Sequence, residues 1–514
     1  MKFVSTRDAS QLFSLGEALF SGYAPDGGLL VPQWLPQVDE ATLQKWSQLD
    51  YLDLSVEVLY PFVQDDMSRN ELHELLEMAL KGFDTDLKNL VPVVPMSLEG
   101  NNEAPNIFIA ELFHGPTFCF KDFGLRVTIQ WLNFFATRRN ASVTLIVSTT
   151  GDTGPAAVQA VQDCNSSSRL GVLVHFPKGQ ISDFQRKQLT TATSTRVKIV
   201  AFQGGGDDMD VPIKNIIMTS KSIHTNDKNR VVCGVNSYNI GRPLMQMVHF
   251  VWTYLRVAER RKRDHPSENL QLDIVVPTGA MGNLAGCYMA KKMGVPLGIL
   301  CAGVNINDIT DVVFRTGKLE RNIDQQLKKT LSDAINIQLP YNMERLLFYL
   351  TEQDHDQIRD WYSQLEGPGR FCDISTSNRW WSKLKSEFQS ARVTDEELCE
   401  AMRSTLHQYG YWADPHTCVA LAAAKKLGYW NEKSNPVAIM ATAAPCKFQE
   451  AMTKALGVEK WQEYERLHFP TRGKILNEMK EIPTTVYASD ATKTLAENQR
   501  DWEAKARELI EQFS

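Results

Sequence analysis

The stretch "VTLIVSTTGDTGPAAVQAVQ", residues 143–162, decides the fold of this chain. A continuous run of β-branched and aliphatic residues ends in a glycine-rich turn, and a small-residue stretch with helical spacing follows. An apolar run without polar alternation is typical of a parallel strand that is buried on both faces. The stretch therefore predicts a strand–turn–helix unit of an α/β protein.

The same unit recurs along the chain. Further apolar runs of this kind occupy residues 170–177, 272–278, 297–305 and 436–444. We therefore predict parallel sheets with flanking helices across residues 98–457, with ligands at the carboxyl ends of the strands. Within this core, residues from about 322 to 424 have a more helical and irregular pattern, which predicts a helical insertion.

The two flanking regions have other patterns. Residues 1–97 are predicted to form a mainly helical domain, in which Ser68 and Glu71 have the spacing of a capping box. Residues 458–514 are polar and end in an amphipathic helical pattern, so we predict a C-terminal helical extension. A chain of 514 residues is expected to divide into more than one domain.

The composition excludes several classes of protein. A net charge of −6 gives no general attraction to nucleic acid or anionic lipid, and the basic run 259–264 reads as the solvated end of a helix. The nine cysteines never form C-x-x-C, which favours a reducing compartment and no zinc site. Neither a signal peptide nor a membrane-spanning run is evident. We expect a cytoplasmic protein without nucleic-acid or membrane partners.

One lysine stands among aromatic residues in "ELFHGPTFCFKDFG", residues 111–124. An apolar neighbourhood desolvates the ammonium of Lys121 and lowers its pKa. This suits a lysine that must act as a neutral amine toward a carbonyl compound. The alternative is a surface lysine whose stem packs on the aromatic rings.

Two glycine-rich turns follow predicted strands, "TTGDTGPAA" at 149–157 and "PTGAMGNLAG" at 277–286. Such a turn presents unpaired backbone N–H groups to an anion at the start of a helix. Neither turn is a P-loop or a G-x-G-x-x-G motif, and ordinary tight α/β turns are the alternative. Two such turns and a desolvated lysine together indicate pyridoxal phosphate (PLP), which needs both an amine and a phosphate cradle.

These motifs resemble those of a known family. "ELFHGPTFCFKDFG" resembles the lysine motif E-L-F-H-G-P-T-x-x-F-K-D of threonine synthases, and residues 5–32 are similar to their N-terminal domain. "GVNSYNIGRPLMQ", "LPYNMERLL" and "ATAAPCKF" follow in the family's order, so the resemblance runs from about residue 4 to 456. It implies PLP and the tryptophan-synthase-β-like fold type II. "YNMER" and "FSGYAPDGG" look most similar to a threonine synthase-like branch in animals, which is implied to act as a phospho-lyase.

The resemblance also implies roles for single residues. Lys121 would hold the cofactor covalently and then shuttle protons, and the hydroxyl of Thr442 would contact the pyridine nitrogen. The cofactor phosphate would be bound by Gly279, Ala280, Met281, Gly282 and Asn283. The substrate carboxylate or the cofactor ring would face Ser148, Thr149, Gly151, Asp152 and Thr153. The substrate phosphate is expected near Asn236, Ser237, Asn239 and Arg242.

Among these residues, Arg242 is the first choice for the phosphate, because a guanidinium fork matches a phosphate group. A helix-surface arginine is the alternative, and Arg345 is a second candidate of the same kind. His114 is expected either to reach a phosphate or to bond the backbone. Asp122 reads as a helix cap or a partner of a basic group, and His416 as a structural residue at a helix start. The stretch "DPHT" at 414–417 nevertheless resembles a family motif near the active cleft.

The chain departs from the family pattern at two positions, Ala444 in place of a histidine and Ile240 in place of a tryptophan. Either change is expected to alter the substrate pocket and its control of water. The sequence favours threonine synthase chemistry on O-phosphohomoserine. The alternatives are a phospho-lyase that forms 2-oxobutyrate, ammonia and phosphate from O-phosphohomoserine or O-phosphothreonine, and a non-catalytic PLP-binding signalling protein. A serine or threonine dehydratase is disfavoured by the long N-terminal domain. A monomer or homodimer is expected.

Overall fold

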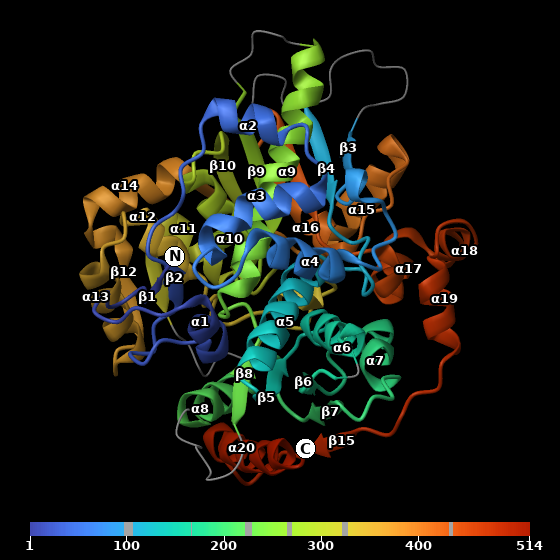
Figure 1. The fold of residues 1–514 in the computed structure, drawn as a ribbon. Helices are drawn as coiled ribbons and strands as arrows, with labels where there is room; N and C mark the ends of the chain where they lie inside the picture. Colours follow the sequence, from blue (N-terminus) through green and yellow to red (C-terminus); the bar gives the residue numbers. More distant parts are fainter. Residues whose placement is uncertain are drawn as a thin grey trace.

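Two open sheets with helices on their faces form the body of the protein (Figure 1). The computed structural model describes residues 1–96, 106–165, 167–220, 229–264, 270–320, 327–430 and 435–513. The expected boundary between residues 97 and 98 lies outside the described residues. In the described part of the chain, no helix is long and apolar enough to cross a membrane.

The larger sheet has six strands in the order β13-β10-β9-β14-β4-β3. Its strands are β13 (Phe388–Arg392), β10 (Leu297–Val304), β9 (Leu272–Pro277), β14 (Val437–Ala441), β4 (Ile107–Glu111) and β3 (Val93–Pro95). All neighbours run parallel except β3 and β4. The central strands β9 and β14 are buried along their whole length, as their unbroken apolar runs predict.

The smaller sheet has five strands in the order β15-β7-β6-β5-β8, and all of its pairs are parallel. Its strands are β15 (Thr485–Tyr487), β7 (Val197–Phe202), β6 (Leu170–Pro177), β5 (Ser142–Ser148) and β8 (Arg230–Gly234). Residues 143–162 form nearly all of β5 and of the helix α6 (Thr153–Asp163), which confirms the predicted strand–turn–helix unit.

Helices cover both sheets. Those of the core are α5 (Lys121–Arg138), α6, α7 (Asp183–Thr190), α8 (Asp210–Ser220), α9 (Gly241–Asp264), α10 (Gly282–Lys292), α11 (Ile309–Thr316), α12 (Met343–Leu350), α13 (His355–Glu366), α14 (Asn378–Glu387), α15 (Asp395–Tyr409) and α16 (Pro415–Lys426). The basic run 259–264 forms the end of α9, as predicted.

The stretch 322–424 carries helices α12 to α15 and the start of α16, but it is not helical throughout. It also supplies β13, which pairs in parallel with β10 at the edge of the larger sheet. A further strand in it, β12 (Phe371–Asp373), pairs with β11 (Lys318–Glu320). Part of this stretch therefore belongs to the sheet itself, since a five-residue strand of mixed polarity gives little sequence signal.

The N-terminal residues lie against the core. They form a small ribbon of β1 (Phe3–Ser5) and β2 (Leu30–Pro32) and the helices α1 (Leu15–Ser21), α2 (Glu40–Trp46), α3 (Tyr51–Val63) and α4 (Arg69–Leu80). The predicted capping box is present, because Ser68 and Glu71 bond reciprocally at the start of α4. The apolar side chains of helices α1 to α4 join those of the larger sheet and of α9 in one hydrophobic cluster.

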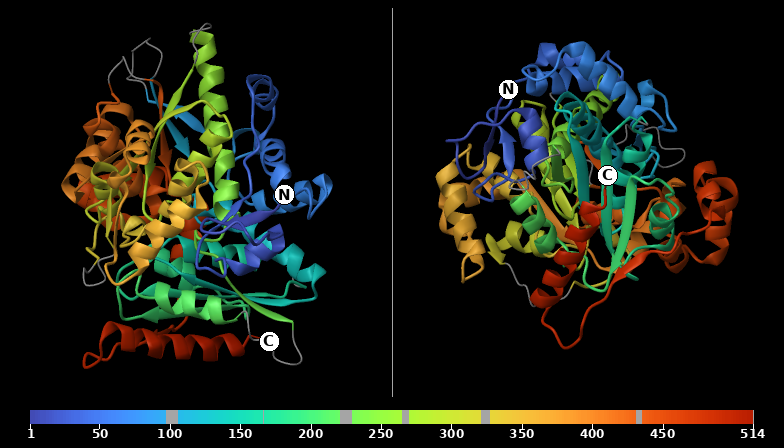
Figure 2. Two further views of the ribbon diagram at one scale, coloured as in Figure 1. Left: turned by 90° about the vertical axis from the view of Figure 1, so that its left-hand side faces the viewer. Right: turned by 60° about the horizontal axis from the view of Figure 1, so that its bottom comes forward.

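The last residues run from the larger sheet to the smaller one. After α17 (Gln449–Leu456) come α18 (Val458–Leu467), α19 (Thr471–Glu478) and α20 (Leu495–Glu511), with β15 between the last two helices. Figure 2 shows α20 along the base of the molecule, next to the smaller sheet. The indole of Trp502 is fully buried in the apolar cluster of that sheet.

Candidate active site

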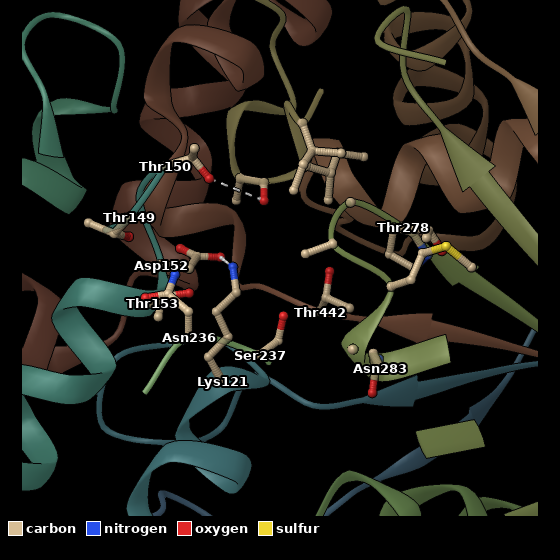
Figure 3. Close-up of a pocket in the computed structure, with 18 of the residues that line it drawn as sticks. Lys121, Thr149, Thr150, Asp152, Thr153, Asn236, Ser237, Thr278, Asn283 and Thr442 are labelled. Carbon is tan, nitrogen blue, oxygen red and sulfur yellow. Dashed lines mark hydrogen bonds and ion pairs between the residues drawn. The ribbon is translucent and has the colours of Figure 1, made fainter. Parts of the chain in front are cut away.

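A cleft of about 850 Å³, open solvent at its mouth included, lies at the carboxyl ends of strands from both sheets. Strands β5 and β9 end at the lining residues Ser148 and Pro277, and the lining residue Thr442 directly follows β14. This is where ligands are expected in open parallel sheets. Figure 3 shows Lys121 in the middle of the cleft, with Thr149 and Thr153 on one side and Asn283 on the other.

Lys121 is the first residue of α5, and its amine points into the cleft toward Asp152 (Figure 3). Only 11% of its side chain is exposed, and Nζ lies 3.8 Å from Oδ2 of Asp152. Burial lowers the pKa of the Lys121 ammonium, against the opposing attraction of Asp152. The ring of Phe120 also lies 5.4 Å from Nζ. The prediction of a desolvated lysine is therefore confirmed.

The loop before Lys121 is fastened to the segment after β14. Phe120 donates its N–H to the carbonyl of Thr442 at 2.8 Å, and Ala444 donates to the carbonyl of Phe118 at 3.0 Å. On the other side, Thr117 donates both its N–H and its hydroxyl to Asp122 at 2.8 Å. These bonds hold the lysine and the Thr442 hydroxyl at the same end of the cleft.

The turn between β9 and α10 is open to the cleft. Met281 adopts a left-handed conformation with φ 61°, which directs the chain into α10 at Gly282. Asn283 is 5% exposed, and its Nδ2 has no hydrogen-bond partner among the described residues. Its Oδ1 accepts from His249 Nε2 at 2.8 Å, which fixes the orientation of the amide. A helix start with a free amide donor is suited to an anion.

The turn between β5 and α6 is occupied by side chains of the protein. Gly151 has φ +136°, and a Cβ there would lie 2.3 Å from Gln185 Nε2, so only glycine fits. Gln185 donates to Oδ1 of Asp152 at 3.0 Å, and Lys447 donates to the same oxygen at 2.7 Å. Burial opposes the charge of Asp152, but the ammonium groups of Lys447 and Lys121 outweigh it and hold its pKa well below the usual range.

Arg242 lines the cleft and is 2% exposed. Its Nη1 donates to the carbonyl of Val235 at 3.2 Å, while its Nε has no partner among the described residues. Burial lowers the pKa of Arg242 to about 10, and no carboxylate is among the groups that offset this effect. A buried guanidinium with a free donor is a natural partner for an anionic ligand.

Comparison with known proteins identifies the family of the chain. Family models described as the threonine synthase N terminus and the threonine synthase C-terminal region match residues 2–80 and 417–495. "Threonine synthase-like 2" of Homo sapiens is 34% identical over 456 residues, which is 88% of this chain and 89% of that protein. The chain belongs to the threonine synthase family. "Threonine synthase" of Saccharomyces cerevisiae is 31% identical and covers 93% of both chains.

Solved structures of the threonine synthase family share the fold. Threonine synthase from yeast has a TM-score of 0.82 at 28% identity, covering 98% of this chain and 99% of its own. The PLP-bound threonine synthase from Brucella melitensis has a TM-score of 0.81 at 28% identity, covering 97% of this chain and 99% of its own. The predicted α/β fold type II with an N-terminal domain is therefore confirmed.

The cleft brings together all but two of the residues that the family resemblance selects. Its lining includes Lys121, Ser148, Thr149, Asp152, Thr153, Asn236, Ser237, Arg242, Gly279, Ala280, Met281, Gly282, Asn283 and Thr442. Gly151 lies behind the turn against Gln185. Asn239 is fully buried outside the cleft, because its amide donates to the carbonyls of Leu19 and Gly234 at 2.8 and 3.0 Å.

Other expectations for single residues are corrected by the structure. Arg345, the second phosphate candidate, is fully buried, and its guanidinium donates to the carbonyls of Leu30, Ser237 and Tyr238. It ties β2 to the wall of the cleft and lies outside the lining. Nε2 of His114 lies 2.7 Å from Oε2 of Glu111, also outside the lining.

The two departures from the threonine synthase pattern do not reach the cleft directly. Ile240 is fully buried in the main hydrophobic cluster, and Ala444 is 3% exposed beside the lysine loop. Neither lines the cleft. The expected change of the substrate pocket therefore does not come from contact of these two side chains with the lining.

Several residues that line the cleft were not predicted from the sequence to be site residues. Asp207, Asp210 and Tyr341 line the cleft. His416 lines it too, which agrees with the resemblance of "DPHT" to a motif near the cleft and not with a purely structural role. His416 lies 2.9 Å from Asp414 through Nδ1, and its Nε2 accepts the N–H of Ala334 at 3.1 Å. Burial raises the pKa of Asp207 to about 7 and that of Asp210 well above its usual range. The run "GGGDDMD" at 204–210 was the available signal for the two acids.

Proposed function

We propose that this member of the threonine synthase family uses PLP to release phosphate from a small phosphorylated amino acid, with O-phosphohomoserine as the first candidate. One observation carries the proposal: the cleft holds both a desolvated amine at Lys121 and a buried guanidinium at Arg242 with a free donor. The amine suits a carbonyl cofactor, and the guanidinium suits the phosphate of a substrate.

The residues of the cleft fit PLP. The orphaned amide Nδ2 of Asn283 and the backbone at the start of α10 would hold the cofactor phosphate. Thr442 offers a hydroxyl for the pyridine nitrogen, and Lys121 offers an amine for the aldehyde. When bound, PLP supplies an electron sink that stabilises negative charge at the substrate carbons. The same cofactor is named for the threonine synthase of Brucella melitensis.

Two side chains of the cleft have separate roles in the proposed reaction. Arg242 binds and orients the substrate phosphate, so that the bond from Cγ to oxygen breaks with the negative charge already matched. Lys121 takes the proton from Cα and returns one to the substrate, since its amine stays within reach once freed. In the full reaction Cβ loses a proton and Cγ gains one. Phosphate leaves from Cγ, the hydroxyl of water adds at Cβ, and the remaining proton of that water goes to the released phosphate.

The identity of the product is the finer part of the proposal. Addition of water at Cβ gives L-threonine, which is the first candidate, because threonine synthases share the fold and the lysine motif. Release before this addition gives 2-oxobutyrate and ammonia. Two observations favour this second candidate: the similarity to the threonine synthase-like proteins, and Ala444 where the synthase pattern has a histidine.

The test is to incubate the purified chain and PLP with O-phosphohomoserine, and separately with O-phosphothreonine. Phosphate, threonine and 2-oxobutyrate are then quantified. We expect phosphate release from O-phosphohomoserine and its loss in Lys121→Ala. A chain that binds PLP but releases no phosphate from either compound would overturn the proposal and favour a non-catalytic role. The ratio of threonine to 2-oxobutyrate decides between the two candidate products.

A further inference from the structure

A second lysine lies behind the cleft. Lys447 has no exposed side-chain surface and does not line the cleft. Its Nζ donates to the carbonyl of Thr117 at 3.0 Å and lies 2.7 Å from Oδ1 of Asp152. A lysine is almost never fully buried without a paired charge, so this ion pair is what keeps Lys447 charged.

The carboxylate of Asp152 is therefore shared unequally by two lysines. Lys447 is at hydrogen-bond distance from one oxygen, whereas Lys121 lies 3.8 Å from the other. Gln185 also donates to the oxygen that Lys447 contacts, at 3.0 Å, which fixes the carboxylate in this orientation. Asp152 faces the cleft while its charge is already matched from behind.

This arrangement bears on the charge of Lys121. Two ammonium groups and one carboxylate cannot all be matched in a site from which water is largely excluded. Attraction to Asp152 raises the pKa of Lys447 despite burial, whereas burial lowers the pKa of Lys121. If Lys447 were absent, the nearest counter-ion of Asp152 would be Lys121 itself, which would then keep its proton.

The remaining titratable groups around the pair act in both directions. An ionised Cys119 would raise the pKa of Lys121, but burial raises the pKa of the Cys119 thiol to about 11 and so keeps it neutral. The groups that influence Lys121, Asp152 or Lys447 from the neighbouring elements are Arg242, His416, Asp122, Asp333 and Cys119. Arg242 further disfavours a charge on Lys121. Asp122 supports the charge of Lys447, but both its oxygens accept from Thr117.

We infer that Lys447 is a positioning residue whose ammonium engages Asp152 from behind the cleft and so leaves Lys121 free to lose its proton and act as an amine. The inference rests on the proposed function only in taking Lys121 as the reactive amine. Lys447 touches neither the cleft nor any ligand in it, so it acts through Asp152.

The first test is a pH titration of the visible absorbance of PLP bound to the full chain, which reports the protonation of the Lys121 nitrogen in its bond to the cofactor. In Lys447→Met, Lys121 is the remaining lysine partner of the Asp152 carboxylate. The midpoint of the absorbance titration is therefore expected to move up by about one pH unit. Lys447→Arg keeps the cation and is expected to retain the wild-type midpoint. An unchanged midpoint in a folded Lys447→Met protein would overturn the inference.

A second readout needs neither the cofactor nor turnover, because it measures the reactivity of the free amine of Lys121. In the full chain without PLP, the rate at which trinitrobenzenesulfonate labels Lys121 is measured by mass spectrometry. A shift of one pH unit lowers the neutral fraction of the amine about tenfold, so labelling in Lys447→Met is expected to slow by about that factor below the pKa. Because this readout needs no substrate, it still tests Lys447 if the chain fails to release phosphate.

Two further variants separate an electrostatic effect of Lys447→Met from a structural disturbance caused by the same substitution. Lys447→Met combined with Asp152→Asn removes both charges, so its midpoint is expected at or below that of the wild type. A raised midpoint in this double variant would contradict the role of Asp152. Lys292→Met, which removes a partly buried lysine 3.3 Å from Glu387, is the matched control and is expected to change neither readout.

Discussion

The two glycine-rich turns of the cleft have similar sequences but differ in whether side chains of the protein already fill them. The turn before α6 is filled by the protein: Gln185 packs against Gly151, and the charge of Asp152 is matched by Lys447. The turn before α10 is left open, and Nδ2 of Asn283 has no hydrogen-bond partner in the described part of the chain. Both are strand–turn–helix units at the carboxyl end of a parallel strand.

The difference teaches that the local motif does not decide whether a turn holds a ligand. What decides it is the supply of side chains from other parts of the chain. In the turn before α6 the carboxylate of Asp152 already supplies a negative charge, which lies 2.7 Å from Lys447 and 3.8 Å from Lys121 and therefore acts on Lys121. The turn before α10 keeps its donors free for a ligand.

The largest effect is expected at Lys121, which lies between the two turns. Lys121→Ala removes the amine but leaves the turn before α10 intact. Phosphate release is therefore expected to fall by at least about a thousandfold, while PLP still binds without its lysine-bound absorbance. Spectra and equilibrium dialysis measure the two effects, and Lys318→Ala, at an exposed strand residue, is the control. Substantial turnover by Lys121→Ala would remove the basis of the proposed function.

A second comparison separates two buried arginines. Arg345 donates to three backbone carbonyls and to Oδ1 of Asn342, so Arg345→Gln is expected to lower the free energy of unfolding by about 3 kcal/mol. Arg242 has a free donor in the cleft, so Arg242→Gln is expected to lower kcat/KM about a hundredfold with a change in unfolding free energy below about 1 kcal/mol.

Urea unfolding and steady-state kinetics with O-phosphohomoserine measure the two quantities for both variants. If Arg242 binds the substrate phosphate and Arg345 stabilises the fold, one variant must lower mainly kcat/KM and the other mainly the free energy of unfolding. If Arg242→Gln unfolded the chain as readily as Arg345→Gln, or left kcat/KM unchanged, Arg242 would be a structural residue like Arg345.

The fold was largely predictable from the sequence, because it depends on local patterns. The apolar runs of β5, β9 and β14 are short, contain β-branched residues and are followed by glycine or proline, which separates them from helices, and the capping box at Ser68 marks α4. The strand β13 was missed, since its polarity is mixed and its place in the sheet is set by pairing with β10.

The site was predictable only where a motif carries it. The lysine loop and the turns were found. The sequence ranked Arg242 above Arg345, but it could not show which carbonyls each guanidinium reaches or that, of the two, Arg242 lines the cleft. Asn239 was misplaced for the same reason. Asp207 lies in a run without periodicity, and its place in the cleft depends on tertiary packing.

A smaller effect is expected when the open turn is narrowed. A Cβ at Gly282 would lie 2.8 Å from Cβ of Ser237, so Gly282→Ala must displace the start of α10. Overpacking of this kind costs about 1–3 kcal/mol, and we expect PLP to bind about tenfold more weakly. Gly151→Ala, in the filled turn, is expected to lower stability more than PLP affinity.

Titration of PLP by fluorescence quenching and thermal unfolding measure these effects. Gly369→Ala is the control, because nothing lies within 4 Å of a Cβ at that position. If Gly151→Ala weakened PLP binding as much as Gly282→Ala, the two turns would not differ in the way proposed.

The smallest effect is expected from Asp207, on the side of the cleft that no sequence motif marks. Burial and the neighbouring Asp208 raise the pKa of Asp207 to about 7, so the carboxyl is neutral below that pH and negative above it. A substrate phosphate is already doubly ionised above about pH 6, so ionisation of Asp207 adds repulsion without a compensating change in the substrate. KM for O-phosphohomoserine is therefore expected to rise several-fold between about pH 6.5 and pH 8, and Asp207→Asn is expected to flatten this rise. Inhibition by homoserine, which lacks the phosphate, is expected to change less over the same range. A KM that stays level across the range in the wild type would mean that the phosphate lies away from Asp207, on the Arg242 side of the cleft alone.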